Sequence, residues 1–447
     1  MLPVLIAGAG PVGLTAAVAL AEAGVPVRVF EAAAGIEQDL RASTFHPPTL
    51  DMLERFGITA TLLEQGLVCP HWQVRLHPSG ERAVFDLSVL KNDSAHPYRL
   101  QCEQWKLSRA LLAKLGAYPH AAVSFGTRVT AVAQDAGSVT FTLECGGGDQ
   151  TVRGAHAIAA DGARSGLRQQ LNIAFEGETY PEITLLATTD FAFEAAMPGL
   201  SNVTYCWHEA GGNFSLLKVP GRWRVSIYPP DGVAPDDALA DDAMEAALQA
   251  IVPRGECYRV MEKRPYRVHQ RIAATYRRGR VFLAGDAAHV NSPSGGMGMN
   301  GGVHDALNLA DKLARVARGE AESLLDLYER QRRPVAQEQI IKQAGANRAR
   351  MRERDPAQRL ASLRALQAII EDPVKLHAHL LRTSMIEGLR HSAGLERACA
   401  RIAGRTKGIA RKRAPTVHRR RRGCGPRPRR ERLRTPMIEG QRHSAGL

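Results

Sequence analysis

The stretch Pro3-VLIAGAGPVGLTAAVALAEAGVPVRVF-Glu31 decides the fold of this chain. It begins with an apolar run over residues 3–7 that is short enough for a buried strand, and a glycine-rich turn follows. We expect an alanine-rich helix over residues 14–23 and a second apolar strand over residues 25–30. Strand, glycine turn, helix and strand in this order predict a Rossmann-like βαβ unit and hence an α/β fold.

The turn of this unit carries the pattern G-x-G-x-x-G. Gly8 permits the tight turn, Gly10 lets a pyrophosphate approach the backbone, and Gly13 allows the helix to pack closely on the strand. Glu31 closes the second strand, where it can accept a hydrogen bond from a ribose hydroxyl and would repel a 2′-phosphate. The unit therefore predicts an adenine dinucleotide and leaves open whether it is FAD or NAD.

A second strand, loop and helix lies at residues 280–311. The apolar run 281–284 leads into a loop with Gly285, Asp286 and several further glycines, and apolar residues then recur at helical spacing. Such a loop aims free backbone N–H groups and the helix dipole at one point, which predicts a site for an anion or a cofactor. The match to G-x-G-x-x-G at residues 296–301 is set aside, because no acid follows at the required distance.

The middle of the chain contains a third polar cluster and a strand-rich block. The cluster DGARSGLR at residues 161–168 follows three strands expected between residues 123 and 158, which predicts a polar group at the carboxyl edge of the sheet. Residues 175–274 read as strands interrupted by one acidic helix and carry no cofactor pattern, so they are the candidate substrate side. Side chains that could line a pocket there are Trp207, His208, Tyr228, Tyr266 and His269.

The positive charge of the chain is concentrated at its C-terminal end. Residues 401–447 hold 16 of the 59 Lys and Arg residues but only 2 of the 45 Asp and Glu residues, so residues 1–400 carry 43 of each sign. The formal net charge of +14 thus belongs to a basic tail, which we expect to be disordered because it has few apolar residues to bury. Residues 381–395 recur at 433–447 with two differences, which favours a duplicated coding end over an independent domain.

Cysteine usage and hydropathy point to the cytoplasm. The seven scattered cysteines include no C-x-x-C pair, which argues against a disulfide framework or a zinc site. The uncharged run from Leu2 to Ala21 lacks a basic flank and contains three glycines, so we interpret it as the strand and helix above rather than as a membrane span.

Three separated motifs together resemble one family. They are GAGPVGL at residues 8–14 with Glu31, DGARSGLR at residues 161–168, and GDAAHVNSPSGGMGMNGG at residues 285–302. In their order, spacing and residues, these motifs resemble those of the class A FAD-dependent aromatic hydroxylases, which are p-hydroxybenzoate-hydroxylase-like flavoprotein monooxygenases. The resemblance covers about residues 1–395.

The resemblance implies a discontinuous FAD-binding domain with an inserted, β-sheet-rich substrate domain and a C-terminal helical segment. The FAD-binding domain would comprise residues 1–68, 101–174 and 275–330, and the substrate domain residues 69–100 and 175–274. Residues 331–395 would form the C-terminal helices and residues 396–447 the basic tail.

The family's site residues carry over motif by motif. The resemblance implies that Gly8, Gly10 and Gly13 surround the pyrophosphate, that Glu31 binds the adenosine ribose, and that Arg41 corresponds to an Arg that follows the second strand. Gln104 resembles the Gln that faces the ribityl chain of the flavin, with Gln101 as a competitor.

The two later motifs supply the remaining site residues. Asp161 is associated in the family with FAD and pyridine-nucleotide handling, and Asp286 resembles the ribityl ligand. Residues Gly298, Met299 and Asn300 resemble the backbone cradle under the pyrimidine edge of the flavin. Pro293 would lie beside the reacting face and is the predicted catalytic residue.

The implied function is an FAD-dependent monooxygenase that uses NADH or NADPH and O2 to hydroxylate a phenolic or related aromatic substrate through a flavin C4a-hydroperoxide. We expect a monomer or homodimer with no specific nucleic-acid partner, no metal and no transmembrane segment. The alternatives are a ubiquinone-type ring hydroxylase and a flavin-binding oxidoreductase that does not hydroxylate. A flavin halogenase is disfavoured, because the W-x-W-x-I-P pattern is missing.

Overall fold

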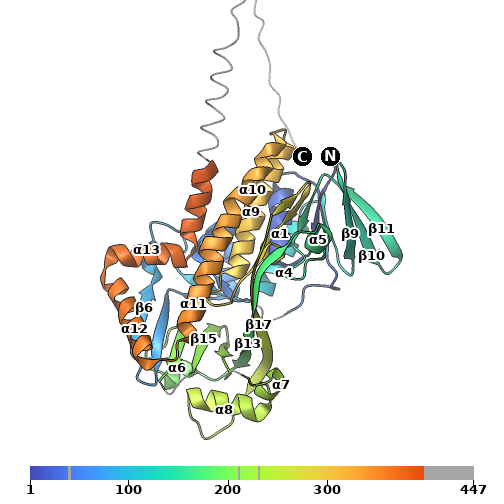
Figure 1. Ribbon diagram of the computed structural model, residues 1–447. Helices are drawn as coiled ribbons and strands as arrows, with labels where there is room; N and C mark the ends of the chain where they lie inside the picture. Colours follow the sequence, from blue (N-terminus) through green and yellow to red (C-terminus); the bar gives the residue numbers. More distant parts are fainter. Residues whose placement is uncertain (39–41, 210–211, 230–231, 397–447) are drawn as a thin grey trace, which may run out of the picture. The chain divides into compact units, whose positions relative to one another are not determined.

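The structure is a computed structural model that describes residues 1–38, 42–209, 212–229 and 232–396 (Figure 1). Its first layer is a six-stranded sheet in the order β18-β19-β12-β1-β2-β8. The bounds of these strands are β1 Val4–Ala7, β2 Val27–Phe30, β8 Ala121–Ser124, β12 His156–Ala159, β18 Arg277–Arg278 and β19 Val281–Leu283. All neighbours pair in parallel except β18 with β19, as expected for a doubly wound sheet.

Helices cover this sheet because its strands are apolar on both faces. Helix α1 (Pro11–Glu22) connects β1 to β2 and packs against α4 (Gln104–Leu115) and α9 (Gly298–Ala317). A three-stranded antiparallel sheet of β9 (Arg128–Gln134), β10 (Val139–Cys145) and β11 (Gly148–Gly154) adds to the same core, in which the ring of Phe30 meets that of Phe141. The expected α/β fold with a Rossmann-like unit is confirmed.

The segment between residues 123 and 158 contains more strands than the sequence predicts. The expected turn at residues 146–148 is present between β10 and β11. A further turn separates β9 from β10, where the carboxylate of Asp135 accepts hydrogen bonds from the N–H groups of Gly137 (2.7 Å) and Ser138 (2.8 Å). This Asx-type turn interrupts an alternating pattern that otherwise reads as one strand.

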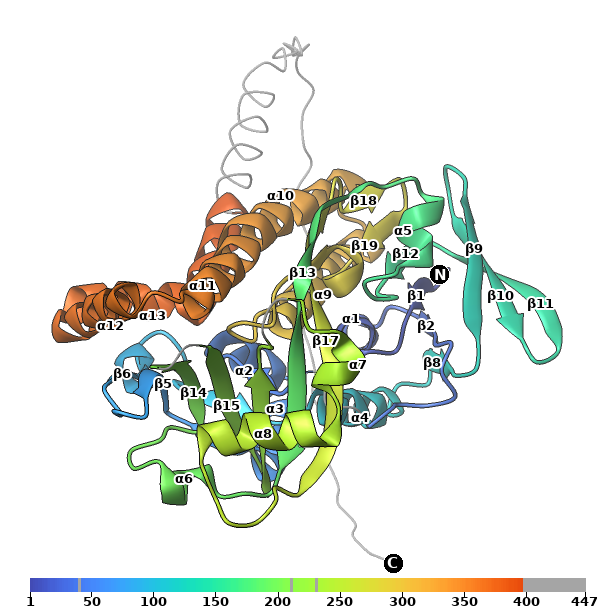
Figure 2. The same cartoon turned by 60° about the horizontal axis from the view of Figure 1, so that its bottom comes forward.

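The second layer is an eight-stranded sheet in the order β20-β17-β13-β16-β15-β14-β5-β6. The strands are β5 His71–His77, β6 Arg82–Asp86, β13 Phe175–Thr189, β14 Val203–His208, β15 Asn213–Val219, β16 Arg222–Ile227, β17 Val260–Ala273 and β20 His289–Val290. Strands β13 and β17 pair along most of their length and lie side by side in Figure 2. Helices α6 (Phe193–Ala196), α7 (Pro235–Ala238) and α8 (Asp241–Ile251) supply side chains to the apolar core on one face.

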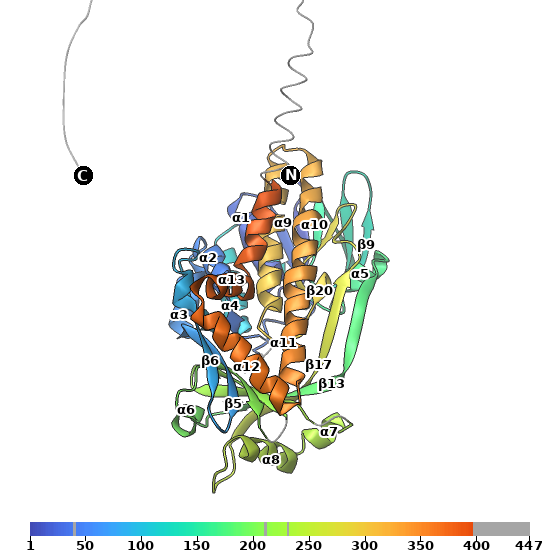
Figure 3. The ribbon, with the colours of Figure 1, turned by 60° about the vertical axis from the view of Figure 1, so that its left-hand side comes forward.

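The opposite face of this sheet is partly covered by the C-terminal helices. Helix α10 (Asp326–Val335), a π-helical turn η4 (Ala336–Ile341) and α11 (Lys342–Arg352) follow one another, and α12 (Pro356–Glu371) and α13 (Pro373–Thr383) come next (Figure 3). A separate core joins Trp72 and Phe85 of the sheet to Leu363 and Leu380 of the helices.

Shorter elements connect these layers. A small sheet has the order β3-β7-β4, with β3 at Thr44–Phe45, β4 at Leu67–Cys69 and β7 at Arg99–Gln101. The short helices are α2 Pro47–Glu54, α3 Ile58–Gln65, η1 Leu87–Leu90, α5 Gly166–Gln170, η2 Gly285–Ala287 and η3 Glu322–Leu325.

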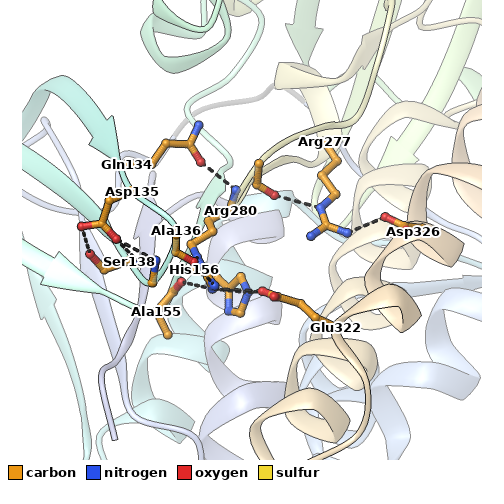
Figure 4. A network of polar contacts seen from close by, with 12 residues as sticks. Gln134, Asp135, Ala136, Ser138, Ala155, His156, Arg277, Arg280, Glu322 and Asp326 are labelled. Carbon is orange, nitrogen blue, oxygen red and sulfur yellow. Dashed lines mark hydrogen bonds and ion pairs between the residues drawn. The ribbon is translucent and has the colours of Figure 1, made fainter.

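A polar network fixes the start of α10 against the edge of the six-stranded sheet (Figure 4). Arg280, directly before β19, donates to the carbonyl oxygen of Ala136 (2.6 Å) and pairs with Glu322 (3.0 Å). The carboxylate of Glu322 also hydrogen-bonds His156 on β12 (2.9 Å), while Arg277 pairs with Asp326 at the start of α10 (2.5 Å). The network thereby connects β12, β19, η3 and α10.

Candidate active site

Four predicted site segments follow the carboxyl ends of neighbouring strands. In the parallel register Ala7 of β1 lies beside Phe30 of β2 and Ala159 of β12, and Ala159 lies beside Leu283 of β19. Because parallel strands end at the same edge, the segments that begin at Gly8, Glu31, Asp161 and Gly285 meet there.

The three glycines of the first turn occupy different environments. A Cβ atom at Gly8, whose φ is +101°, would lie 2.3 Å from the carbonyl oxygen of Ala160, and one at Gly13 would lie 2.0 Å from that of Gly8. A Cβ at Gly10 would meet no atom of the described residues within 4 Å. Gly8 and Gly13 are therefore required by close backbone packing, whereas Gly10 borders open space.

That open space lies at the N-terminus of α1. The first backbone hydrogen bond there runs from Leu14 N–H to Gly10 O (3.0 Å), and no side chain in the described part of the chain caps the helix. The N–H groups of Val12 and Gly13 thus precede the first intrahelical bond. Two free N–H groups, the positive end of the dipole and room beside Gly10 fit a pyrophosphate.

Glu31 joins the ends of β1 and β2. One carboxylate oxygen accepts a hydrogen bond from the N–H of Ala9 (2.7 Å), and the other accepts from the N–H of Ala33 (2.9 Å). The side chain is only half-buried. Since each carboxylate oxygen can accept more than one hydrogen bond, Glu31 can hold this turn and still receive a ribose hydroxyl.

Asp161 follows β12 and faces the same edge. One oxygen accepts from the N–H of Leu167 (3.2 Å), and Oδ1 is buried with no hydrogen-bond partner among the described residues. Burial raises the pKa of Asp161 above its ordinary value. A buried acceptor without a donor fits a hydroxyl or amide from a ligand at this edge.

The loop after β19 leads directly into α9. Asp286 is exposed in η2, and a Cβ at Gly302 would lie 2.5 Å from the side chain of Val12 and 3.0 Å from the Cα of Gly285. These close approaches bring the start of α1, the Gly285 turn and the start of α9 together.

The N-terminus of α9 offers backbone donors. The N–H of Gly301 donates to Met297 O (2.8 Å) as the first bond of the helix, so the N–H groups of Gly298, Met299 and Asn300 precede it. The Asn300 side chain is fully buried, accepts from the N–H of His46 (2.9 Å) and donates to Thr44 O (2.8 Å). Its amide thus attaches α9 to β3, while its backbone belongs to the predicted cradle.

A buried ion network that no sequence motif predicts supports this loop. The carboxylate of Asp305 on α9 pairs with Arg332 on α10 (2.6 Å) and with His289 (2.8 Å), and it accepts from the N–H of Gly285 (3.3 Å). Burial opposes ionisation, but Arg332 and His289 outweigh it and hold the pKa of Asp305 below its ordinary value. An i, i+16 spacing between His289 and Asp305 could not reveal this pairing without the fold.

The two glutamine candidates differ in their surroundings, and Arg41 lies outside the described residues. Gln101 is fully buried, and its amide donates to Thr44 Oγ1 (3.0 Å) within the small sheet. Gln104 begins α4 with a half-buried side chain, and its N–H donates to Ala42 O (2.9 Å).

A small cavity borders Pro293, whose ring is exposed. It lies between the loop, the eight-stranded sheet and α11, and its lining residues are Thr184, Tyr228, Val268, Ser292, Pro293, Ser294, Arg348, Met351 and Arg352. Burial raises the pKa of Tyr228 to about 12, so this phenol stays protonated at neutral pH. Trp207, another candidate from the sequence, is instead in the core and donates to the carbonyl oxygen of Arg350 (2.9 Å).

The described part of the chain contains neither a candidate membrane span nor a candidate metal site. None of its helices is long and apolar enough to cross a membrane. Its His, Cys, Asp and Glu side chains also form no group of three or more that could hold a metal ion.

Comparison with known proteins identifies the family. The profile of the family described as "FAD binding domain" matches residues 1–343. The para-nitrophenol 4-monooxygenase of Pseudomonas sp. (strain WBC-3) is 36% identical over 392 residues, which cover 87% of this chain and 96% of that protein. The pentachlorophenol 4-monooxygenase of Sphingobium chlorophenolicum is 35% identical over 342 residues, covering 75% of this chain and 62% of that protein.

Solved structures agree with the sequence relatives. The crystal structure of p-nitrophenol 4-monooxygenase from Pseudomonas putida DLL-E4 superposes with a TM-score of 0.81 at 33% identity, covering 87% of this chain and 98% of that one. A ternary complex of aklavinone-11 hydroxylase with FAD and aklavinone gives a TM-score of 0.70 at 30% identity, covering 78% and 69%. The chain therefore belongs to the FAD-binding-domain family of flavin-dependent aromatic monooxygenases, the class A aromatic hydroxylases.

Proposed function

We propose that this enzyme hydroxylates a phenolic ring, with FAD as bound cofactor, NADH or NADPH as hydride donor and O2 as the second substrate. The observation that carries the proposal is the meeting of two free helix N-termini, those of α1 and α9, at one edge of a parallel sheet beside the cavity at Pro293. Relatives that act on para-nitrophenol and pentachlorophenol support a phenolic substrate.

Each part of this edge has a proposed role toward FAD. The N-terminus of α1 with Gly10 receives the pyrophosphate, Glu31 the adenosine ribose, and Asp161 and Asp286 the hydroxyl-bearing chain near the flavin. Gln104 is the first residue of α4, its side chain is half-buried, and it faces the hydroxyl-bearing chain of FAD. Gln101 is the weaker candidate, because its amide already donates a hydrogen bond to Thr44. We also propose that Arg41 contacts a phosphate of FAD or the flavin.

The start of α9 stabilises negative charge on the pyrimidine edge of the flavin. Bound FAD supplies the redox chemistry, which is hydride uptake and oxygen activation. The N–H groups of Gly298, Met299 and Asn300, at the positive end of a 20-residue helix, are fixed donors that need no reorganisation when charge develops. The buried Asp305 network and the Asn300 amide keep that helix start in place.

Pro293 and the side chains around it exclude water from the reacting face. The cavity wall combines the Pro293 ring with Val268 and Met351, so a bound aromatic ring would displace water there. We call Pro293 a catalytic residue in this sense, because it would touch the substrate or the flavin.

The sheets suggest how the chain divides. All strands of the six-stranded sheet come from residues 4–30, 121–159 and 277–283, which supports an FAD-binding domain of residues 1–68, 101–174 and 275–330. The eight-stranded sheet draws on residues 71–86 and 175–273, which supports the substrate domain, although β20 joins it from the Gly285 loop. The free cysteines of the described part support a cytoplasmic location, and we propose a monomer or homodimer without a nucleic-acid partner.

The decisive experiment measures NAD(P)H consumption, hydroxylated product and hydrogen peroxide in one reaction, with and without 4-nitrophenol. We expect a yellow protein that releases FAD on denaturation, and a rise in NAD(P)H oxidation of about tenfold or more with the phenol. Pro293→Ala should retain FAD but shift electrons towards peroxide, because the reacting face loses part of its water exclusion. A colourless protein that takes up no added FAD would refute the proposal, and phenol-independent oxidation that yields only peroxide would favour a non-hydroxylating flavoprotein.

A further inference from the structure

The face of the eight-stranded sheet that looks toward the cavity is polar at its centre. In the antiparallel register Leu186 lies opposite Ser226, Thr188 opposite Arg224, and Ser226 opposite Ser215, which itself lies opposite Tyr205. Since directly paired residues share a face, these side chains form one surface, which also carries Thr184 and Tyr228 of the cavity wall. The other face is apolar and packs beneath α8.

Arg99 of β7 lies over this polar surface. Its guanidinium carbon is 5.0 Å from the centre of the Trp72 ring, and its side chain hydrogen-bonds that of Tyr205. Arg99 also lies near the Pro293 loop: burial and, secondly, the charge of Arg99 lower the pKa of His46, whose ring hydrogen-bonds the carbonyl of Gly295 in that loop (2.8 Å). Burial and, secondly, the neighbouring Tyr205 raise the pKa of Tyr228, which lines the cavity.

The charge of Arg99 has no counterion in the described part of the chain. The residue is only 3% exposed, it forms no ion pair there, and its Nε and one terminal nitrogen have no hydrogen-bond partner. Burial lowers its pKa, but an arginine stays protonated in proteins, so it cannot escape the cost by becoming neutral.

Other buried arginines show what is usual in this protein. Arg332 is 1% exposed and pairs with Asp305, and one of its terminal nitrogens has no partner. Arg75, which is 4% exposed, also has no counterion among the described residues, but it donates to the carbonyl oxygen of Pro198 (2.9 Å) and leaves only its Nε without a partner. Arg99 differs from both in leaving two of its nitrogens without a partner. A buried cation with two unused donors, beside a tyrosine and an aromatic face, therefore suits an anion that comes from outside the protein.

We propose that Arg99, assisted by Tyr205, binds the anionic oxygen of the aromatic substrate, so that the enzyme selects aromatic anions over neutral rings of the same shape. This inference rests on the proposed function and deepens it by naming the charge of the substrate and the residue that reads it. A phenolate and a ring-bound carboxylate share the required chemistry, namely a delocalised oxyanion that two guanidinium N–H groups can bind.

The test compares the holoenzyme with Arg99→Met, by titrating the flavin absorbance with two matched pairs of probes. The first pair is 4-nitrophenol, at a pH where it is ionised, and its neutral methyl ether 4-nitroanisole. The second is 4-hydroxybenzoate and 4-hydroxybenzamide. We expect Arg99→Met to raise the Kd of the anion in at least one pair by about 10- to 100-fold and that of its neutral partner by about twofold or less. The pair that responds shows whether a phenolate or a carboxylate is recognised.

Arg75→Met is the matched control, because it removes an equally buried arginine from the other face of the sheet. It should lower thermal stability and leave the ratio of anion to neutral affinity unchanged. Arg99→Met should keep or increase the Tm of the ligand-free protein, since it removes an uncompensated charge, and Arg99→Lys should retain part of the anion preference.

Two results would overturn the role of Arg99. One is an unchanged anion preference in Arg99→Met, and the other is a lower Tm or a failure to fold, which would show that the cation is needed by the structure itself. Absence of phenol-stimulated NAD(P)H oxidation in the unmodified enzyme would instead contradict the proposed function, and the titration would still report on Arg99.

Discussion

Individual residues of the first turn look alike in sequence but act through different contacts. Gly13 is required by the fold, since a methyl group there would lie 2.0 Å from a backbone oxygen, while Gly10 faces space that the described residues leave open. The backbone φ of Gly10 is −70°, which alanine can also adopt. The same distinction separates a residue that folding requires from one that a ligand requires.

We therefore expect Gly10→Ala and Gly13→Ala to fail in different ways. Gly10→Ala should fold with nearly the parental Tm as apoprotein but bind FAD at least about tenfold more weakly, because a methyl group occupies the proposed pyrophosphate path. Gly13→Ala should lose about 1–3 kcal/mol of stability, since the backbone must move to admit the methyl group. FAD titration and thermal unfolding of both apoproteins distinguish the two effects, and equal FAD affinity of Gly10→Ala and the parent would move the pyrophosphate elsewhere.

Residue types and short spacings predicted where the glycine turn, Glu31, Asp161 and the start of α9 lie in the fold, because their contacts fall within one βαβ unit or one loop. Their roles toward FAD stay predictions. The sequence could not reveal the side-chain role of Asn300, whose partners His46 and Thr44 are about 250 residues away. Arg99 was also missed, because an unpaired buried cation is recognised only when the burial and partners of every neighbour are known.

At the scale of elements, α9 and α10 are joined by a buried charge pair rather than by apolar packing alone. The side chains of Asp305 and Arg332 are at most 1% exposed, in contrast to the pair of Arg277 and Asp326 at the start of α10, where Asp326 is 48% exposed (Figure 4). Removing one partner of a buried pair leaves the other charge uncompensated, whereas an exposed pair is screened by water.

Asp305→Asn should accordingly cost about 3–5 kcal/mol of unfolding free energy, against about 1 kcal/mol or less for the control Asp326→Asn. Urea denaturation of both holoenzymes measures the difference. Because Asp305 also accepts from the N–H of Gly285, we expect Asp305→Asn to release FAD at a lower urea concentration than the control does. Similar losses in the two variants would mean that the buried network contributes little.

The C-terminal helices show what element prediction leaves open. The family resemblance correctly implied helices after residue 331, but it could not show that α11 lines the cavity at Pro293 through Arg348, Met351 and Arg352. The π-helical turn η4 before it brings Ile340 against α9, where a Cβ at Gly301 would lie 2.6 Å from the Ile340 side chain. Such contacts follow from the path of the chain in space, which local sequence does not encode.

At the scale of the whole molecule, buried histidines make stability depend on pH. Burial, with a contribution from Arg99, lowers the pKa of His46 from 6.5 to about 3, and burial with Arg332 does the same for His304. The folded protein therefore keeps both rings neutral where the unfolded chain binds protons. Their contribution to stability is complete above pH 6.5 and is lost as the pH falls from there towards 3.

For each pH unit that the pH falls within that window, each of these histidines should lower the unfolding free energy by about 1.4 kcal/mol. His304→Gln, which can keep a hydrogen bond to Thr49 Oγ1, should reduce the slope by that amount. Urea midpoints of parent and variant, measured at several pH values between 6.5 and 4.5, supply the comparison. A slope that is the same in both proteins would show that His304 takes up a proton without unfolding.

The basic charge of the chain is separable from the catalytic body. The described residues up to 396 contain all three apolar cores and every candidate site residue except Arg41. Glu396, which the sequence assigned to the tail, pairs with Arg315 (2.6 Å). A chain that ends after Arg397 keeps this pair and loses residues whose formal charge equals that of the entire protein. It should retain FAD content and Tm but lose salt-sensitive retention on heparin or DNA, because few other cations are unbalanced.

A second truncation, after Thr383, is the matched control for this prediction. It removes Met385 and Ile386, which are each 5% exposed, and the carbonyl of Ser392 that accepts from the Gln331 amide (2.8 Å). Losing two buried apolar side chains should cost about 2–5 kcal/mol each, so this shorter chain should unfold at a clearly lower temperature than the chain ending at Arg397. If the chain ending at Arg397 were as unstable as the chain ending at Thr383, residues 398–447 would have to contribute to folding, and the basic segment could not be separated from the folded body without loss of stability.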